Sequence, residues 1–586
     1  MPNSVGLHPG EQYSPVTGLI YVFNLIVGTG CLTLPAAFAA AGWGLSAGGI
    51  LLLALVSYMT TTWVVESMAC ANAINHWRRM KQLKKVPFAS SPDHHLGYQN
   101  HCLQHISPPP SPPPPADTLL ESLCTTTTIS ASTFTATCTS TASPCLQDAA
   151  DNSLTSMTSI LRGQVADELV NRTLENAEAD LRSTDTSEDQ DDHEEESPLI
   201  TEGVIERTVG EYYAIQEQIE MGQMAELFYP KVWDKVFYVV LCIYLYGDLA
   251  IYVAAVAKSL RDSICNYVPE NCTMELMDAD PCFRDSDLTR LDLYRICTAA
   301  FIGVMGPFVF FNLTKTKYMQ MITTLTRWLA MGIMIAWAIV LLAEEKGDGH
   351  PPPADVTKLP QLFGVCVYSF MCHHSLPALI TPVNEKRSII KLLGADYLLI
   401  LMFYYLLAFT GVFAFVRLND LYTLNFQPDR CKTSDTSLIV YALQVFLLMF
   451  PVFTLSTNFP IIAITLRNNL KGLCLRESRR YSFFTTRCLF PLLAIIPPTL
   501  VGLVTTDVEI LVGITGAYAG SFIQYVVPAT LVYYARKMTL RHIGMGVKNP
   551  FSAPLQHSAW IVIICVWAAL CQVFVTIYLV EQYKGK

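Results

Sequence analysis

Charged residues are scarce in this sequence: Asp, Glu, Lys and Arg make up 15% of its 586 residues, whereas 52% are hydrophobic. A soluble globular domain usually carries about a quarter charged residues, so the composition excludes an ordinary soluble protein. The formal net charge is −10 and much of the acidic excess lies in the run 188–196, so no basic nucleic-acid-binding surface is expected. No cleavable signal peptide is expected either, because polar residues precede a first apolar stretch long enough to cross a bilayer.

Apolar stretches of about twenty residues predict an all-α membrane protein of about eleven spans, whose principal partner is the lipid bilayer. The predicted spans are 17–41, 45–69, 236–257, 294–311, 319–343, 361–382, 393–416, 438–465, 488–505, 509–534 and 558–580. They divide the chain into a cytosolic N-terminus (1–16), helices one and two (17–69), a largely disordered cytosolic loop (70–235), helices three to five (236–343), helices six to ten (359–535), helix eleven (558–580) and a tail (581–586).

The distribution of Lys and Arg sets the orientation. Basic residues are concentrated in the loops after spans two, four, six, eight and ten, which places the N-terminus in the cytosol and the C-terminus in the lumen or outside the cell. This orientation puts a glycosylation sequon at Asn271 on the oxidising side, together with the loop cysteines Cys265, Cys272, Cys282 and Cys431. Four cysteines allow three disulfide pairings, and the sequence does not choose between them.

The long loop between spans two and three has the composition of a disordered chain. Residues 86–215 contain a proline run, a Ser/Thr run and an acidic block, which cannot bury enough apolar surface to offset the entropy of ordering. The segment that follows, IEMGQMAELFYPKVW, is predicted to be an amphipathic element leading into span three, or simply an extension of that span at the membrane surface.

Two short patterns in this region resemble sorting signals. Glu195, Leu199 and Ile200 fit an acidic dileucine signal, which clathrin adaptors read in the cytosol and which directs proteins to endosomes and lysosomes. Tyr212 and Ile215 fit a looser tyrosine-based signal. A clathrin adaptor is therefore a predicted partner, and an endolysosomal membrane is favoured over the plasma membrane.

Spans one and six are predicted to be interrupted near mid-membrane. Span one has Gly-Thr-Gly at 28–30 with Pro35 beyond, and span six has paired histidines at 373–374 with Pro377 beyond. Both carry a matching phrase, TLPA and SLPA, and span six enters the membrane in the opposite direction to span one. This pattern favours an inverted five-plus-five helix repeat whose site lies at the two breaks. The alternative is that Gly and Pro, which are common in membrane helices, serve packing alone.

Ionisable and hydroxyl groups inside the spans are the next candidates for function. Asp248 lies near the middle of span three and Arg327 about a third of the way into span five, so the two could pair, or Asp248 could carry a proton. Alternatively, Asp248 is structural and Arg327 snorkels to the cytosolic face. His374 and its neighbour titrate near the pH of an acidic organelle. Thr454 and Thr457 in span eight offer oxygens to sodium or a substrate amine, or else bond their own helix.

Five stretches of the sequence resemble the transmembrane protein 104 family. They are GLIYVFNLIVGTG, IYLYGDLAIYVAAV, FGVCVYSFMCHHSLPALITPV, FPVFTLSTNFPIIAITLRNN and LVGITGAYAGSFIQYVVPA. The resemblance covers nearly all of the membrane portion and does not extend to the loop. That family is similar to the amino acid transporter group of the amino acid–polyamine–organocation superfamily, which includes sodium-coupled and proton-coupled carriers.

The resemblance implies inverted five-helix repeats plus an eleventh helix, with substrate between spans one, three, six and eight. The substrate positions it implies are Gly28, Thr29, Gly30, Ser369, Cys372 and His373. The ion position it implies falls on Asn24, Thr454 and Thr457. Asp248 and Arg327 depart from the sodium-coupled relatives, which leaves protons, exchange or no coupling open.

The sequence therefore predicts a secondary transporter of amino acids or similar small zwitterions that works by alternating access without a cofactor. A non-transporting sensor or scaffold, acting through the cytosolic loop 70–235, is the alternative. An enzyme is not expected: an intramembrane aspartyl protease needs a second catalytic aspartate, and paired histidines alone are too few ligands for a catalytic zinc.

Overall fold

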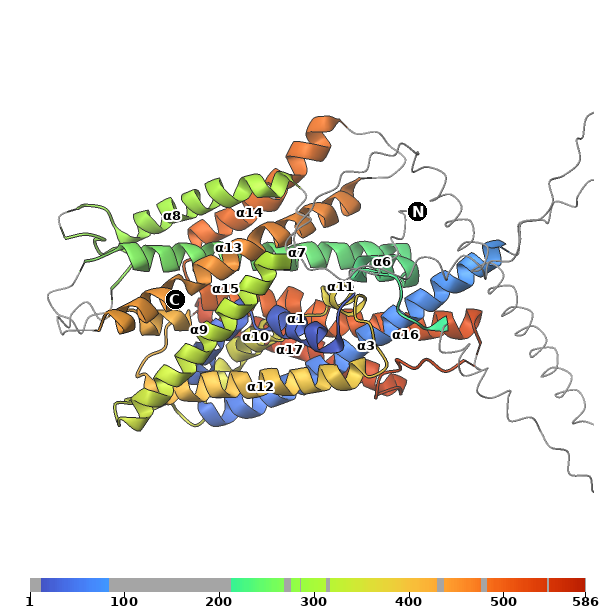
Figure 1. The fold of residues 1–586 in the computed structure, drawn as a ribbon, viewed down its shortest axis with the longest axis horizontal. Helices are drawn as coiled ribbons and strands as arrows, with labels where there is room; N and C mark the ends of the chain where they lie inside the picture. Colours follow the sequence, from blue (N-terminus) through green and yellow to red (C-terminus); the bar gives the residue numbers. More distant parts are fainter. Residues whose placement is uncertain are drawn as a thin grey trace, which may run out of the picture. The chain divides into compact units, whose positions relative to one another are not determined.

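The computed structural model describes residues 12–83, 212–267, 276–284, 286–311, 317–428, 437–475, 482–544 and 547–584. The chain divides into two compact units, residues 1–81 with 209–586 and residues 82–208, and the second lies almost wholly outside the described ranges. Within these ranges the fold is all-α, with two isolated β-bridges and no β-strand. The predicted all-α fold class is confirmed (Figure 1), whereas the inverted repeat stays a prediction.

The helices follow the predicted apolar stretches closely. Their bounds are α1 Pro15–Ile26, α2 Thr29–Ala41, α3 Trp43–Leu83, α6 Met221–Phe228, α7 Lys231–Ile264, α8 Arg290–Met305, α9 Lys317–Ala343, α10 Leu359–Ser369, α11 Leu376–Ile380, α12 Ile389–Ala414, α13 Leu438–Cys474, α14 Phe490–Val504, α15 Val508–Thr515, α16 Val527–His542 and α17 Ser558–Lys584. Two π-helical turns, η6 Gly516–Gly520 and η7 Phe522–Val526, join α15 to α16 in one long element.

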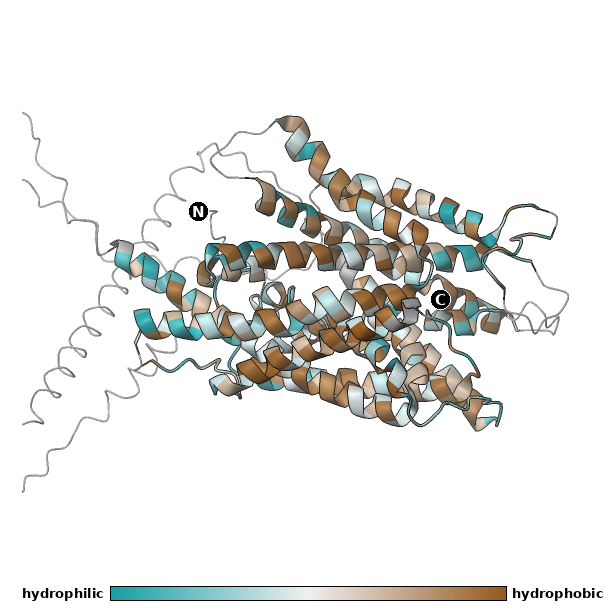
Figure 2. Cartoon of the chain, turned by 180° about the vertical axis from the view of Figure 1, so that it is seen from behind, coloured by the Kyte–Doolittle hydropathy of each residue, from teal (hydrophilic) through white to brown (hydrophobic). Residues whose placement is uncertain are grey.

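Nine helices of the described chain are long and apolar enough to cross a membrane, and the bent pair α1–α2 makes a tenth candidate. The short helices α10 and α11 occupy the stretch predicted as span six. Hydrophobic residues dominate the middle of the bundle, whereas hydrophilic residues gather toward its ends (Figure 2). Leucine, isoleucine and valine are also exposed on the outer helix faces, as in Leu52, Leu398 and Val566, which is the surface that lipid chains require.

Helix α7 lies at the centre of one packed group and α10 at the centre of another. Helix α7 packs against α13, α8, α14 and α15, and α10 packs against α2, α15 and η6. The second group is close-packed because it meets through small residues: a Cβ on Gly516 would collide with the backbone of Gly364. These contacts fix the first half of the broken span six against the body of the bundle.

Both ends of the predicted cytosolic loop 70–235 are ordered. Helix α3 continues to Leu83, and residues 212–230 pack beside it and lead into α7 through the short helix α6. Helix α6 is separated from α7 at Tyr229 and Pro230, so it is a helix of its own rather than an extension of span three. Residues 84–211, which contain Glu195, Leu199 and Ile200, lie outside the described residues.

Cys265 and Cys282 form a disulfide at the end of α7. Buried ion pairs surround it: Arg290 and Arg261 both contact Asp262, with 2.8 Å between Arg261 Nε and Asp262 Oδ1. Two of the four cysteines expected on the oxidising side are therefore bonded to each other. Their predicted companions Asn271, Cys272 and Cys431 lie outside the described residues.

Replacing both Cys265 and Cys282 by Ala should lower the free energy of unfolding by about 3 kcal/mol, because the cross-link closes a segment with a sequence separation of 17. The measurement is the thermal melting temperature of the protein purified in detergent, with and without a reductant. Reductant should lower the melting temperature of the wild type and leave the double variant unchanged. Equal melting temperatures for all four samples would contradict the prediction.

Candidate functional site

Two interrupted helices define the candidate site. Helix α1 ends at Ile26 and α2 begins at Thr29, with a bend of 54° between them. Helix α10 ends at Ser369 and α11 begins at Leu376, leaving residues 370–375 outside regular helix. Spans one and six are therefore broken where Gly28–Gly30 and the paired histidines predict it.

The two breaks touch each other. A Cβ on Gly30 would lie 2.7 Å from Ser369 Cα and 2.6 Å from its Oγ, so only glycine allows α2 to approach α10 this closely. Tyr404 on α12 connects the same two points: its hydroxyl lies 2.7 Å from the carbonyl oxygen of Ser369 and 3.2 Å from that of Ile26. The structure thus places Gly30 and Ser369 in the contact between the breaks rather than on an open wall.

The N-terminal end of α2 is buried and uncapped. Its N-cap is Gly28, which has no side chain to accept from the first backbone N–H groups of the helix. The hydroxyl of Thr29 is also buried, and no described group is its hydrogen-bond partner. Gly28 has space around it, since the nearest atom to a Cβ built there is 3.8 Å away. A helix N-terminus without a side-chain cap, beside a hydroxyl that lacks a described partner, suits an anion such as a carboxylate.

The C-terminal end of α1 carries the opposite arrangement. Arg327 on α9 is 3% exposed, and its guanidinium donates to the carbonyl oxygen of Asn24, one of the groups that the break releases from the helix ladder. The neighbouring Trp328 stacks on Phe23, with 4.4 Å between ring centroids. A fixed cation therefore sits at the negative end of the half-helix. The side-chain oxygen of Asn24 is buried and lacks a partner in the described ranges.

Asp248 does not pair with Arg327, contrary to one of the alternatives that the sequence leaves open. Its carboxylate, 5% exposed on α7, accepts a hydrogen bond from the hydroxyl of Tyr368 on α10. Tyr368 precedes Ser369, so Asp248 reaches the contact between the breaks through one side chain. Among the described residues Asp248 has no ion-pair partner. The carboxyl group of Asp248 is thus held by the hydroxyl of Tyr368.

His373 faces away from this acid and toward α3. Its Nε2 lies 2.8 Å from Thr60 Oγ1 and 3.2 Å from Thr61 Oγ1. Thr60 Oγ1 is also within 3.2 Å of two backbone carbonyls, those of Val56 and Ser57, which can only accept. The Thr60 hydrogen is therefore used there, and we assign the proton of neutral His373 to Nε2, which leaves Nδ1 without a partner in the described structure.

The remainder of the unwound segment is anchored in a similar way. Cys372 Sγ lies 3.3 Å from the hydroxyl of Tyr397 on α12, and Ser57 Oγ donates to the carbonyl of Phe370 over 3.3 Å. Cys372 and His373 thus hold span six against its neighbours. His374 points elsewhere: its ring lies 5.3 Å from that of Tyr244 on α7, and its Nδ1 is buried with no partner in the part of the chain described.

The two threonines of span eight differ. Thr457 Oγ1 donates to the carbonyl of Thr454 over 2.8 Å, so it bonds its own helix. Thr454 Oγ1 is buried and unpartnered within the described ranges, as are the oxygens of Asn24 and Thr29 on span one. Of the implied ion position, Asn24 and Thr454 retain a free oxygen. No group of three or more His, Cys, Asp or Glu side chains capable of holding a metal ion occurs in the described residues.

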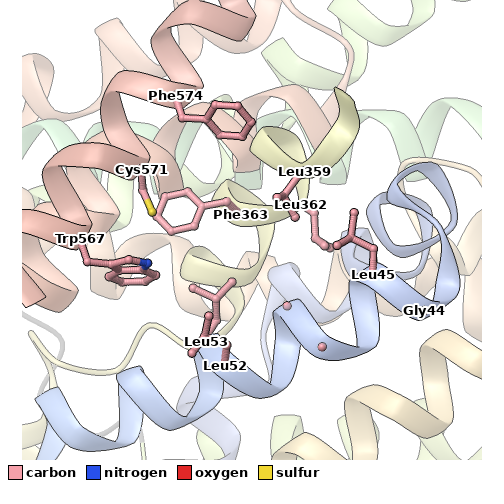
Figure 3. Close-up of a pocket in the computed structure, with 12 residues that line it drawn as sticks. Gly44, Leu45, Leu52, Leu53, Leu359, Leu362, Phe363, Trp567, Cys571 and Phe574 are labelled. Carbon is pink, nitrogen blue, oxygen red and sulfur yellow. The ribbon is translucent and has the colours of Figure 1, made fainter. Parts of the chain in front are cut away.

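A cavity of about 380 Å³ lies apart from the breaks, between α3, α10 and α17. Leu52, Phe363 and Trp567 are among its lining residues, and the glycines of α3 leave it wide (Figure 3). Its walls are almost wholly apolar, so it suits hydrocarbon and offers nothing to hold a charged zwitterion.

Sequence reasoning missed the tyrosines that organise the site. Tyr368 holds the acid, Tyr397 holds the unwound segment, and Tyr404 bridges the breaks. One signal was available: Tyr397 and Tyr404 are seven residues apart, which places them on one face of α12.

The comparisons with known proteins agree with this architecture. The family model described as transmembrane amino acid transporter protein matches residues 11–79 and 208–577, so the chain is a multi-pass membrane protein of that transporter-like family. It is 41% identical to human Transmembrane protein 104 over 97% of this chain and 96% of the relative, and 39% identical to the Drosophila melanogaster homolog over 99% and 100%. A Dictyostelium discoideum homolog is 28% identical over 99% of each chain. The chain therefore belongs to the transmembrane protein 104 family.

Gly30→Ala should destabilise the protein by about 1–3 kcal/mol, because the added methyl group overlaps the backbone of Ser369. Gly28→Ala is the matched control, two residues away in the same break and with room for a methyl group. Melting temperatures of the two purified variants test this. A Gly30→Ala variant as stable as Gly28→Ala would show that the breaks do not touch as described.

Proposed function

We propose that this protein is a secondary transporter of amino acids or similar small zwitterions, and that it binds its substrate at the uncapped N-terminus of α2. The observation that carries the proposal is the buried N-terminal end of this half-helix, which has no side-chain cap, together with the hydroxyl of Thr29, which has no hydrogen-bond partner among the described residues. Backbone N–H groups at a helix N-terminus inside a bilayer cost free energy unless a ligand, water or another group accepts hydrogen bonds from them. A substrate carboxylate would do so.

The ammonium group of the same substrate would be balanced by Asp248. That carboxylate is buried, receives one hydrogen bond from Tyr368, and lies on the element next to the break in α10. A helix N-terminus that favours an anion and a carboxylate that favours a cation would together select a molecule that carries both charges. A buried acid without an ion-pair partner in the described residues is also suited to take up a proton when the site is empty, which would couple transport to protons.

Arg327 supports transport without sodium. A sodium ion would have to be held by carbonyl oxygens at the C-terminal end of α1 and by hydroxyls of span eight. In this protein the guanidinium of Arg327 already donates to the carbonyl of Asn24. The guanidinium would repel a second cation at the same carbonyl. The fixed charge of Arg327 therefore takes the place that a sodium ion would have.

Thr29→Val should weaken binding of an amino acid about tenfold, because it removes the free hydroxyl and keeps the shape of the side chain. Thr33→Val is the matched control: Thr33 lies one turn further along α2 and donates to the carbonyl of Gly30 over 3.1 Å. The measurement is uptake of radiolabelled amino acids into liposomes that contain the purified protein, with an acidic exterior or interior. If no amino acid moves under any ion gradient, the proposal fails.

Replacement of sodium by choline should leave this uptake unchanged, whereas Arg327→Ala should abolish it and Arg327→Lys should retain part of it. The lysine keeps a cation near the carbonyl of Asn24 but loses the planar guanidinium geometry. The measurement is the initial rate of amino acid uptake by the wild type and by the two variants, in liposomes that contain equal amounts of protein. Uptake that requires sodium in the wild type would refute the assignment of Arg327 as the resident cation.

A location in endolysosomal membranes remains part of the proposal. It is supported by the acidic dileucine pattern at Glu195, Leu199 and Ile200, which clathrin adaptors would read from the cytosol.

A further inference from the structure

The segment that returns from the long loop docks on one face of α3. Asn72, His76 and Arg79 are spaced by four and three residues, so they form a stripe along that helix. The ring of His76 meets the ring of Tyr212 edge-on, with 4.8 Å between centroids. Arg79 forms an ion pair with Glu217. The stripe thus contacts the segment at both ends of residues 212–217.

Asn72 binds the backbone of this segment. Its Oδ1 accepts from the amide N–H groups of Gln216 over 3.2 Å and Glu217 over 2.9 Å, and its Nδ2 donates to the carbonyl of Glu217 over 3.3 Å. Asn72 is buried, and its side-chain amide both accepts from and donates to the backbone of the segment, as the backbone of a neighbouring strand would. Residues 214–216 belong to no helix or strand.

Two side chains anchor the segment in the protein. Tyr213 is 4% exposed and Ile215 is 2% exposed. Burial raises the pKa of Tyr213 to about 12, so it docks as a neutral phenol. Further along, α6 packs on α7 and α16, and the hydroxyl of Tyr229 lies 2.7 Å from Thr530 Oγ1 on α16. Residues 212–229 therefore contact α3, α7 and α16.

The same segment contains the tyrosine-based pattern. A protein that reads Tyr-x-x-Ile binds it as an added strand and takes the two side chains, here Tyr212 and Ile215, into separate pockets. In the docked segment Tyr212 lies against His76, Ile215 is buried, and Asn72 occupies the backbone of the next two residues. The segment cannot be docked on α3 and bound by such a protein at the same time, because both interactions use the side chains of Tyr212 and Ile215 and the neighbouring backbone.

We propose that Tyr212–Ile215 is a recognition site for a cytosolic Tyr-x-x-Ile-reading protein, and that it is hidden while residues 212–229 are docked. The site is exposed when the cytosolic ends of α3, α7 and α16 separate. Display of the signal thus depends on the conformation of the membrane portion. This inference does not depend on which substrate, if any, the protein carries.

The test uses full-length protein in detergent and the isolated tyrosine-signal-binding subunit of a clathrin adaptor as the probe. Asn72→Ala should increase binding of the probe about tenfold and should speed hydrogen exchange of residues 212–219. Asn75→Ala is the matched control on the same helix, since the described structure shows no hydrogen bond from Asn75 to the segment, and it should change neither quantity. Adding Tyr212→Ala to Asn72→Ala should return binding to the wild-type level.

His76→Ala provides a second release variant if Asn72→Ala does not fold, as judged by size-exclusion chromatography. Faster exchange in Asn72→Ala, with no binding of the probe by either protein, would overturn the recognition site. Unchanged exchange in both release variants would overturn the docking mechanism. Tight binding of the probe by the wild type, equal to that of Asn72→Ala, would show that the signal is never hidden.

Discussion

The bilayer forces every backbone polar group at membrane depth to find a partner within the protein, and the two helix breaks are where this requirement is hardest to meet. Each break releases N–H and C=O groups from the helix ladder. Side-chain hydroxyl groups supply most of the partners. The hydroxyl of Tyr404 lies within hydrogen-bond distance of the carbonyls of Ile26 and Ser369, and that of Ser57 donates to the carbonyl of Phe370. The arrangement of α3, α9, α10 and α12 follows from supplying these groups.

The two half-helix ends of span one are treated differently. The C-terminal end of α1 has a permanent cation, because Arg327 donates to the carbonyl of Asn24. The N-terminal end of α2 has no corresponding anion in the described residues, and the hydroxyl of Thr29 beside it is unpartnered. The C-terminal end of α1 is paired with a cation, and the N-terminal end of α2 is not paired with a described anion. The N-terminal end of α2 therefore favours a negatively charged group electrostatically.

The positions of the helices and both breaks could be predicted from the sequence, because hydrophobic length and the placement of Gly and Pro report directly on the cost of exposing the backbone to lipid. The partners of the polar side chains could not be predicted. Asp248 and Arg327 are the two charges nearest mid-membrane, yet one binds Tyr368 and the other a carbonyl. The partner that each of these side chains binds depends on how its helix is rotated about its axis, and hydrophobicity alone does not determine that rotation.

The roles of neighbouring residues also depended on rotation. His373 and His374 are equivalent in the sequence, but His373 is fixed by two threonines of α3, whereas His374 lies against Tyr244 of α7. The ends of the loop 70–235, which is predicted to be cytosolic, show the same limit. Contacts with α3 order residues 212–217, and a local sequence pattern cannot predict such long-range contacts.

The hydroxyl of Tyr404 has a single hydrogen and two carbonyls within reach, one on each broken helix. Only one of them can receive that hydrogen at a time, and the shorter distance is to Ser369. A small shift of α1 relative to α10 would reverse the preference at little energetic cost, since one hydrogen bond replaces another. The relative position of the two broken helices is thus coupled to the direction in which the O–H of Tyr404 points, and in this structure it favours Ser369.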